Sequence, residues 1–189
     1  MKTAFEDIYD QYHKDLFQFI FYMVKDKQQT EDIIQEVYIK VLKSYDTFKG
    51  ESSEKTWLFS IARHVTIDFF RKQKRKRNRI IDLFDWSEKG FLIKDEHDLP
   101  EEVAVLNDEM QQVYRCLDKC TMDQKSVIIL RYIQSFSIEE TADTLGWSIS
   151  KVKTTQHRAI KTLKDLLDTG TTGRGEGTEV ESQQRRGKA

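Results

Sequence analysis

Positive charge and aromatic rings gather in one stretch of the sequence, and together they suit nucleic-acid binding. Residues 71–79 hold seven lysines and arginines and no acid, directly behind an aromatic-rich segment. On the helix predicted for that segment, the face opposite Trp57 carries Phe59, Arg63, Thr66 and Phe70. Rings stack on bases of single-stranded DNA at about 1–3 kcal/mol each, while cations hold the backbone. The pattern would also arise if Phe59 and Phe70 completed a core and the cations were solvated, so both interpretations stay open.

A second stretch, SFSIEETADTLGWSISKVKTTQHRAIKTLKDLL, has the signals of a helix-turn-helix. Ser137 and Glu140 match the S-x-x-E capping box that begins a helix. Gly146 suits the left-handed residue that ends it, and Ser148 can cap the following helix. The outer face of that second helix is polar and basic until Asp165, and it carries Ser150, Lys151, Lys153, Thr154, Thr155, His157, Arg158 and Lys161.

Such a face has the chemistry of a major-groove reader. Short polar side chains can hydrogen-bond base edges, while lysines and arginines reach phosphates. In a helix-turn-helix, the second helix enters the groove with its N-terminal residues at the bases. We therefore predict DNA binding, against the plainer interpretation of a helical hairpin with a solvated basic face.

An acidic face is predicted nearer the N-terminus. Asp32, Gln35 and Glu36 recur at i, i+3, i+4, opposite the apolar stripe of their helix. Such a face is either simply solvated or docks a basic partner, and the residues alone favour neither strongly.

Residues that would make or break bonds are not evident. The sequence has no G-x-x-x-x-G-K phosphate loop, no metal-ligand cluster and no Ser/His/Asp grouping, so we expect no enzyme, metal or cofactor. Cys116 and Cys120 are expected to be ordinary helix residues. No apolar run approaches about 18 residues, and the N-terminus lacks a signal-peptide core. We expect no membrane insertion and a cytoplasmic location.

The elements that must position these residues are all predicted to be helices. Apolar residues are dense in residues 5–25, and Thr30 can cap a second helix whose inward positions are Ile33, Ile34, Val37, Tyr38, Val41 and Leu42. A polar loop over residues 44–55 precedes the aromatic-rich helix. Pro100 suits the start of a later helix, and further helices are expected over residues 127–133, 137–145 and 148–167.

The predicted fold is therefore all-α, with two small helical domains. The first spans residues 3–77, and an acidic linker spans residues 78–102, with eight acids between residues 80 and 102. The second domain spans residues 103–168, and a Gly-rich tail over residues 169–189 is expected to be disordered. The net charge of −1 thus hides separate blocks of opposite sign, and the acids can restrain unspecific DNA binding.

These features, in this order, resemble the extracytoplasmic-function (ECF) sigma factors of bacterial RNA polymerase. The resemblance rests on TEDIIQEVYIKVL, KTWLFSIARHVTIDFFRK and VIILRYIQSFSIEETADTLGWSISKVKTTQHRA, and it covers nearly all of residues 5–167. The N-terminal block is most similar to the sigma-X type. The resemblance implies a subunit that binds core polymerase, reads the −35 and −10 promoter elements and stabilises melted DNA. An anti-sigma protein is a further implied partner.

The resemblance also implies residue roles. Asp32, Gln35 and Glu36 match the surface that docks on the β′ clamp helices, and the second domain would meet the β flap. The loop over residues 44–55 would capture a flipped base of the −10 element, with Trp57 anchoring it from inside. The residues implied at the −10 single strand are Phe48, Lys55, Phe59, Arg63, His64, Arg71 and Lys72. Those implied at the −35 element are Ser148, Ser150, Lys151, Lys153, Thr154, Thr155, His157 and Arg158.

Three positions depart from the family pattern. Thr155 stands where an arginine is common, no proline precedes the recognition helix, and Thr141 replaces an isoleucine, which would thin the local core. A stand-alone helix-turn-helix regulator is the main rival interpretation, and it should bind duplex DNA tightly without polymerase. A nucleic-acid-processing enzyme is the second rival.

Overall fold

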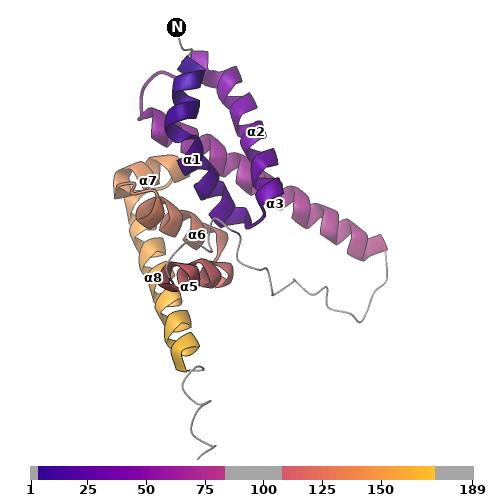
Figure 1. Cartoon of the computed structure of the whole chain (residues 1–189), viewed down its shortest axis with the longest axis vertical. Coiled ribbons are helices and arrows are strands. Elements are labelled where there is room, and N and C mark those ends of the chain that lie inside the picture. Colours follow the sequence, from indigo (N-terminus) through magenta and orange to yellow (C-terminus); the bar gives the residue numbers. More distant parts are fainter. Residues whose placement is uncertain (1–3, 84–107, 173–189) are drawn as a thin grey trace, which may run out of the picture.

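The structure, a computed structural model, describes residues 4–83 and 108–172. Every regular element in these two ranges is a helix, as predicted. We call residues 4–83 the N-terminal module and residues 108–172 the C-terminal module (Figure 1). Residues 173–189 of the predicted tail, Pro100 and most of the predicted acidic linker lie outside the described residues. Residues 169–172, predicted to belong to the disordered tail, instead continue the last helix.

Three helices form the N-terminal module: α1 (Ala4–Val24), α2 (Lys27–Ser44) and α3 (Glu54–Leu83). Each contributes an apolar stripe at helical spacing, and the stripes pack on one another with Leu16, Val37 and Ala62 fully buried. Burial of such stripes, at about 25 cal/mol per Å² of apolar surface, drives this association.

Two details of α2 correct the predictions. Its N-cap is Asp26, whose side chain accepts a hydrogen bond from the Gln29 amide at 2.8 Å. Thr30 lies inside the first turn instead, buried, and its hydroxyl donates to the Asp26 carbonyl. Leu42, predicted to face inward, is 57% exposed because α2 places it on the side away from α1 and α3.

The C-terminal module is built from α5 (Asp108–Cys116), α6 (Met122–Ile128), α7 (Ile138–Leu145) and α8 (Ile149–Thr172). A π-helical turn, Ile129–Ile133, continues α6. Ser137 and Glu140 form the predicted capping box of α7, with bonds of 3.0 and 2.7 Å. Thr141 is fully buried and donates its hydroxyl to the Ser137 carbonyl, so its polar atom is satisfied in the core.

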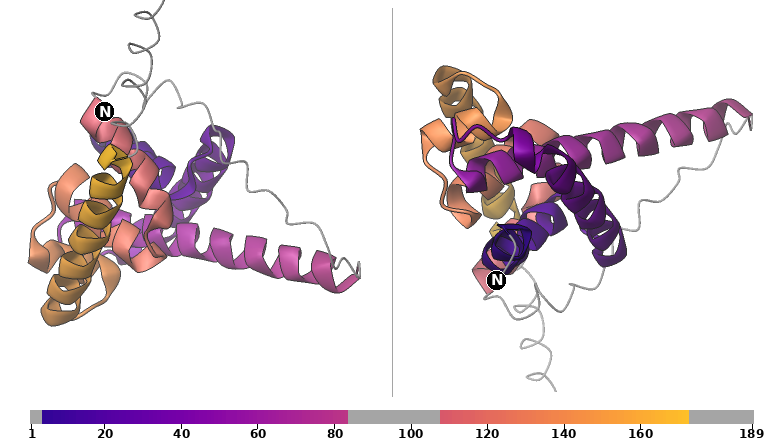
Figure 2. Two further views of the ribbon diagram at one scale, coloured as in Figure 1. Left: turned by 90° about the horizontal axis from the view of Figure 1, so that it is seen from below. Right: turned by 90° about the horizontal axis from the view of Figure 1, so that it is seen from above.

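The two modules pack against each other. Helix α7 lies on α3, and α6 and the π-helical turn lie on α1, which joins the buried residues into one continuous cluster (Figures 1 and 2). This arrangement brings together elements that are far apart in the sequence.

Helix α3 extends well beyond both cores. It continues to Leu83, past the predicted domain boundary at residue 77, and its second half projects from the molecule in every view (Figure 2). The side chains described from Arg71 to Lys76 are all exposed. The cations Arg71, Lys72, Lys74, Arg75 and Lys76 are therefore exposed on a projecting helix.

Candidate nucleic-acid interface

The start of α8 is fixed by a tight turn after α7. Gly146 has φ 64°, in the left-handed region that favours glycine, and the Trp147 amide donates to the Ala142 carbonyl at 2.9 Å. The Ser148 hydroxyl accepts from the Lys151 amide at 3.2 Å, as the predicted cap requires. Val152 and Ala159 are fully buried, which anchors the inner face of α8 and turns its polar face outward.

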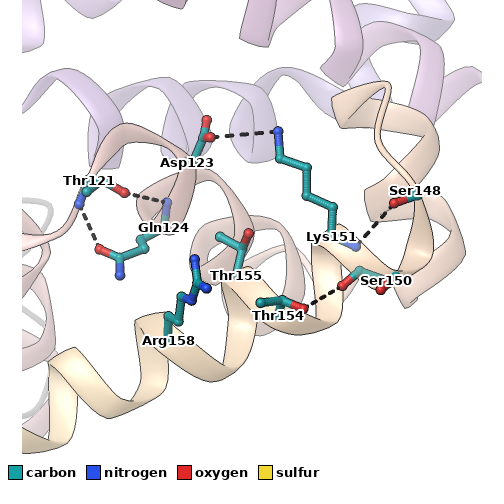
Figure 3. Close-up of a pocket in the computed structure, with 9 residues that line it drawn as sticks. All are labelled: Thr121, Asp123, Gln124, Ser148, Ser150, Lys151, Thr154, Thr155 and Arg158. Atoms are coloured by element: carbon teal, nitrogen blue, oxygen red, sulfur yellow. Dashed lines mark hydrogen bonds and ion pairs between the residues drawn. The ribbon is translucent and has the colours of Figure 1, made fainter.

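All of the residues predicted for the −35 element lie on this outward surface. Seven of the eight are exposed, and Thr155 is half-buried. The eight residues are Ser148, Ser150, Lys151, Lys153, Thr154, Thr155, His157 and Arg158. Most of them line one side of a groove of about 530 Å³ (Figure 3).

The other side of that groove comes from the start of α6, which the sequence analysis did not select. Thr121 and Gln124 form a second capping box there, with bonds of 2.9 and 3.3 Å, and Asp123 lies between them in sequence (Figure 3). The T-x-x-Q pattern was available as a helix-start signal. Nothing in the sequence indicated that this helix start would face α8.

Asp123 changes the electrostatics of the interface. Its carboxylate lies 4.0 Å from Lys151 Nζ and 3.8 Å from Arg63 Nη2. Residues 149–164 of α8 contain no acid, but in three dimensions the Asp123 carboxylate lies beside Lys151, the first lysine of the helix. Lys151 Nζ also lies 3.7 Å from the centroid of the Trp147 ring.

The predicted −10 loop is held by aromatic packing. The Trp57 ring lies 4.8 Å from the Phe48 ring and 6.1 Å from the Tyr45 ring, centroid to centroid. Tyr45 donates its hydroxyl to the Glu54 carboxylate at 3.1 Å. Trp57 therefore has the position expected of an internal anchor for the loop.

The resemblance implied that Phe59 contacts the −10 single strand, and the structure contradicts this role in the present conformation. Phe59 is fully buried, with ring centroids 5.4 Å from Phe19 and 5.1 Å from Phe136. Its ring has aromatic neighbours on both modules and is closed to a base. We assign it to packing, which is the alternative that the sequence left open.

The other residues predicted for the −10 single strand divide into two groups. Lys55 and Arg63 are partly buried in contacts with the C-terminal module. His64, Arg71 and Lys72 are exposed on α3, and Arg71 pairs with Asp68 at 3.2 Å. A groove of about 440 Å³ runs beside α3, and its lining includes Ile67 and Met122, which the sequence analysis did not select.

The surroundings of Arg63 shift the pKa of its guanidinium. Desolvation lowers the pKa of its guanidinium, and the neighbouring Asp123 carboxylate partly opposes that shift. The Arg63 guanidinium also lies 5.5 Å from the Trp147 ring centroid, while its Nε has no hydrogen-bond partner within the described residues.

The predicted polymerase-docking face is present on α2. Asp32 and Gln35 are exposed and Glu36 is half-buried. Ile39, 52% exposed, and Leu42 continue this face by one and two turns. Leu42 was missed because the helical period assigned it to the core, and the sequence analysis did not select Ile39.

The described residues contain no group of three or more potential metal ligands. Cys116 and Cys120 are free thiols, and burial raises the pKa of both. No helix in the described part of the chain is long and apolar enough to cross a membrane.

Comparison with known families finds two matches. Residues 8–76 match Sigma-70 region 2, and residues 110–163 match Sigma-70, region 4. These ranges fall on the N-terminal and C-terminal modules respectively.

Individual proteins agree with these matches. The chain is 58% identical over 168 residues to the ECF RNA polymerase sigma factor SigX of Bacillus subtilis, covering 89% of this chain and 86% of that protein. It is 33% identical to the RNA polymerase sigma factor YlaC of the same organism, covering 86% and 91%. Among solved structures, the sigma factor RpoE in complex with the anti-sigma factor NepR from Bartonella quintana superposes with a TM-score of 0.66. That chain is 27% identical, and the match covers 86% of this chain and 98% of that one.

Proposed function

The chain belongs to the ECF sigma factors of bacterial RNA polymerase, and from this premise we propose which of its surfaces perform each step of initiation. A sigma factor is a transcription initiation factor and not an enzyme. It directs polymerase to promoters by reading the −35 and −10 elements and stabilising melted DNA.

The face of α2 is the proposed contact with core polymerase, at its β′ clamp helices. The exposed Asp32 and Gln35 and the half-buried Glu36 offer acidic and amide groups that complement a basic partner. Ile39 and Leu42 add an apolar patch that would be buried on docking. This combination of exposed acids and exposed apolar residues on one helix face is the observation that carries the proposal.

The face of α8 is the proposed reader of the −35 element. The seven residues from Ser148 to Thr154 begin the helix at a fixed turn, which is the geometry that brings short side chains to base edges. The exposed cations Lys153 and Arg158 would reach phosphates. The same module would also meet the β flap of the polymerase.

The loop before α3 and the exposed face of α3 are the proposed −10 surface. Phe48, held against Trp57, would contact the flipped base, and His64, Arg71 and Lys72 would follow the single strand. Lys55 and Arg63 belong to this surface only once their contacts with the C-terminal module are released.

An anti-sigma protein is a further proposed partner, because the similar RpoE chain was solved with one. We place the protein in the cytoplasm, where RNA polymerase acts.

Reversing one charge tests the docking surface. Glu36→Lys should lower affinity for core polymerase by at least about tenfold, because a complementary charge becomes a repulsive one. The measurements are binding to core enzyme and run-off transcription from a promoter library. Asp7→Lys makes the same charge change at an exposed site on α1 and should leave core affinity near that of the wild type. Normal core affinity for the Glu36→Lys variant would contradict the assignment, and equal run-off transcription without the chain would contradict the function itself.

A further inference from the structure

One side chain of α8, Gln156, is held by the π-helical turn that continues α6. Arg131 Nε donates to the Gln156 side-chain oxygen at 3.3 Å, and the Gln156 side-chain nitrogen donates to the Tyr132 hydroxyl at 2.9 Å. An arginine only donates hydrogen bonds, so the amide oxygen must face Arg131 and the amide nitrogen must face Tyr132. Two adjacent residues of the turn therefore fix this amide in one orientation.

The Arg131 guanidinium also holds the entry to α7. It donates a second hydrogen bond to the carbonyl of Phe136, the residue before the Ser137 cap of that helix. The turn itself is closed by the Gln134 amide, which donates to the Ile129 carbonyl at 2.9 Å, the i→i+5 spacing of a π-helix. One guanidinium thus connects the π-helical turn, the entry to α7 and the middle of α8.

The Tyr132 hydroxyl is accessible and still has a hydrogen bond to give. Tyr132 is 54% exposed, and its hydroxyl oxygen accepts from Gln156. Among the residues that the structure describes, no acceptor takes the hydroxyl proton. Since a tyrosine hydroxyl can accept and donate at once, this proton is available to an acceptor outside the chain.

This hydroxyl borders the proposed reader of the −35 element. Gln156 is half-buried on α8, and Lys153, one helical turn before it, is exposed on the same flank of the helix. Lys151 and Arg158 line the groove shown in Figure 3, on the opposite flank of the polar face. Tyr132 therefore lies beside the flank that carries Lys153, a proposed phosphate contact.

A phosphate oxygen of the DNA backbone is the acceptor that suits this position. When a recognition helix enters the major groove, neighbouring segments meet the backbones that border the groove, and tyrosine hydroxyls are among the groups that bond to phosphates. A hydroxyl that donates to an anionic oxygen makes a short, strong hydrogen bond.

We infer that Tyr132 is an uncharged phosphate contact at the edge of the −35 element, and that Arg131 and Gln156 are the positioning residues that orient its hydroxyl. This inference rests on the proposed reading of the −35 element by α8. The contact adds affinity for DNA without adding charge.

Tyr132→Phe tests the contact because it removes the hydroxyl and keeps the ring. In complex with core polymerase, this variant should bind a promoter fragment, selected by run-off transcription from a library, about tenfold more weakly than the wild type. The loss should be equal for fragments that differ in the −35 sequence. The slope of log affinity against log salt should stay unchanged, because an uncharged donor releases no counterion. Tyr9→Phe makes the same change at an exposed site on α1 and should bind as the wild type does.

Gln156→Leu tests the positioning role because it removes both hydrogen bonds of the amide at similar side-chain volume. This variant should lose promoter affinity by a similar factor, again with an unchanged salt slope. Adding Tyr132→Phe to it should cause no further loss, because the two residues act through one contact. Circular dichroism and binding to core polymerase check that each variant is folded and docks normally.

Three results would overturn the phosphate assignment: wild-type affinity for Tyr132→Phe, a changed salt slope, or a loss that depends on the −35 sequence. Losses that add in the double variant would overturn the positioning role of Gln156. A wild-type complex without promoter preference would contradict the proposed function instead, and that measurement does not involve any variant of Tyr132.

Discussion

At the scale of single residues, the sequence indicated the outward chemistry of α8 well and that of α3 less well. Polar residues opposite a clear apolar stripe are exposed, as at Lys153 and Arg158. At Phe59, α3 is covered on one side by Phe19 of the N-terminal module and on the other by Phe136 of the C-terminal module, so Phe59 is buried although it lies opposite Trp57. The spacing of apolar residues along one helix indicates which of its faces is apolar, but not how many other helices pack against it.

Lys153→Ala should weaken promoter binding by the polymerase complex similarly for all sequences, because a phosphate contact carries no sequence information. The slope of log affinity against log salt should fall by about 1. Titrations at several salt concentrations measure this. Lys14→Ala removes the same charge from an exposed site on α1 and should leave the slope unchanged. A loss confined to one promoter sequence would instead indicate a base contact.

Tyr38 gives the N-terminal module a dependence on alkaline pH. Burial raises the pKa of this tyrosine, whose hydroxyl is hydrogen-bonded to His13 Nδ1 at 3.0 Å. The folded state therefore keeps a proton that the unfolded chain releases near pH 10. This contribution to stability is present below that pH and is lost as the pH rises towards the folded-state pKa.

Tyr38→Phe should accordingly flatten the fall of the free energy of unfolding above pH 10. It should also lower that free energy near pH 7.5 by about 1 kcal/mol, because the hydrogen bond to His13 is lost. Urea unfolding across this pH range measures both effects. The exposed Tyr132 offers Tyr132→Phe as a control, which should follow the wild type at high pH. A Tyr38→Phe profile parallel to the wild type would contradict the account.

At the scale of elements, helix starts and stops were the most predictable features. The structure confirms the capping box at Ser137, the glycine turn at Gly146 and the cap at Ser148. These features were predictable because each depends only on residues close in sequence. The cap of α2 was misplaced, since Asp26 and Thr30 both carry a suitable oxygen and only the chain path after α1 selects the first. The π-helical turn at Ile129–Ile133 has no local signal, because an apolar run fits it and an α-helix equally.

Gly146→Ala should destabilise the C-terminal module by about 1 kcal/mol, the cost of placing a residue with a Cβ in the left-handed region. A Cβ there meets no atom within 4 Å, so the cost is conformational and not steric. Gly146→Asn should cost less, because asparagine tolerates this conformation. Urea unfolding of the three proteins measures the order. Equal stability of the alanine variant and the wild type would contradict the role of the turn.

At the scale of the whole molecule, the all-α class and the two helical modules followed from composition and period. Their mutual packing did not. Gln134, Gln18 and Asp123 look like surface residues in sequence, and they acquire partners only when two distant segments meet. Contacts between modules depend on shape and on long-range pairing, for which a single sequence offers no periodic signal.

The projecting half of α3 has a practical meaning for changing this protein. The first half of α3 packs in the cores, and its second half extends from them without packing partners among the described helices (Figure 2). The side chains from Arg71 to Lys76 are exposed. Shortening it or exchanging its cations leaves both interiors intact. Under the proposed function, exchanging these cations should change how strongly opened DNA is retained without changing which start sites α8 selects.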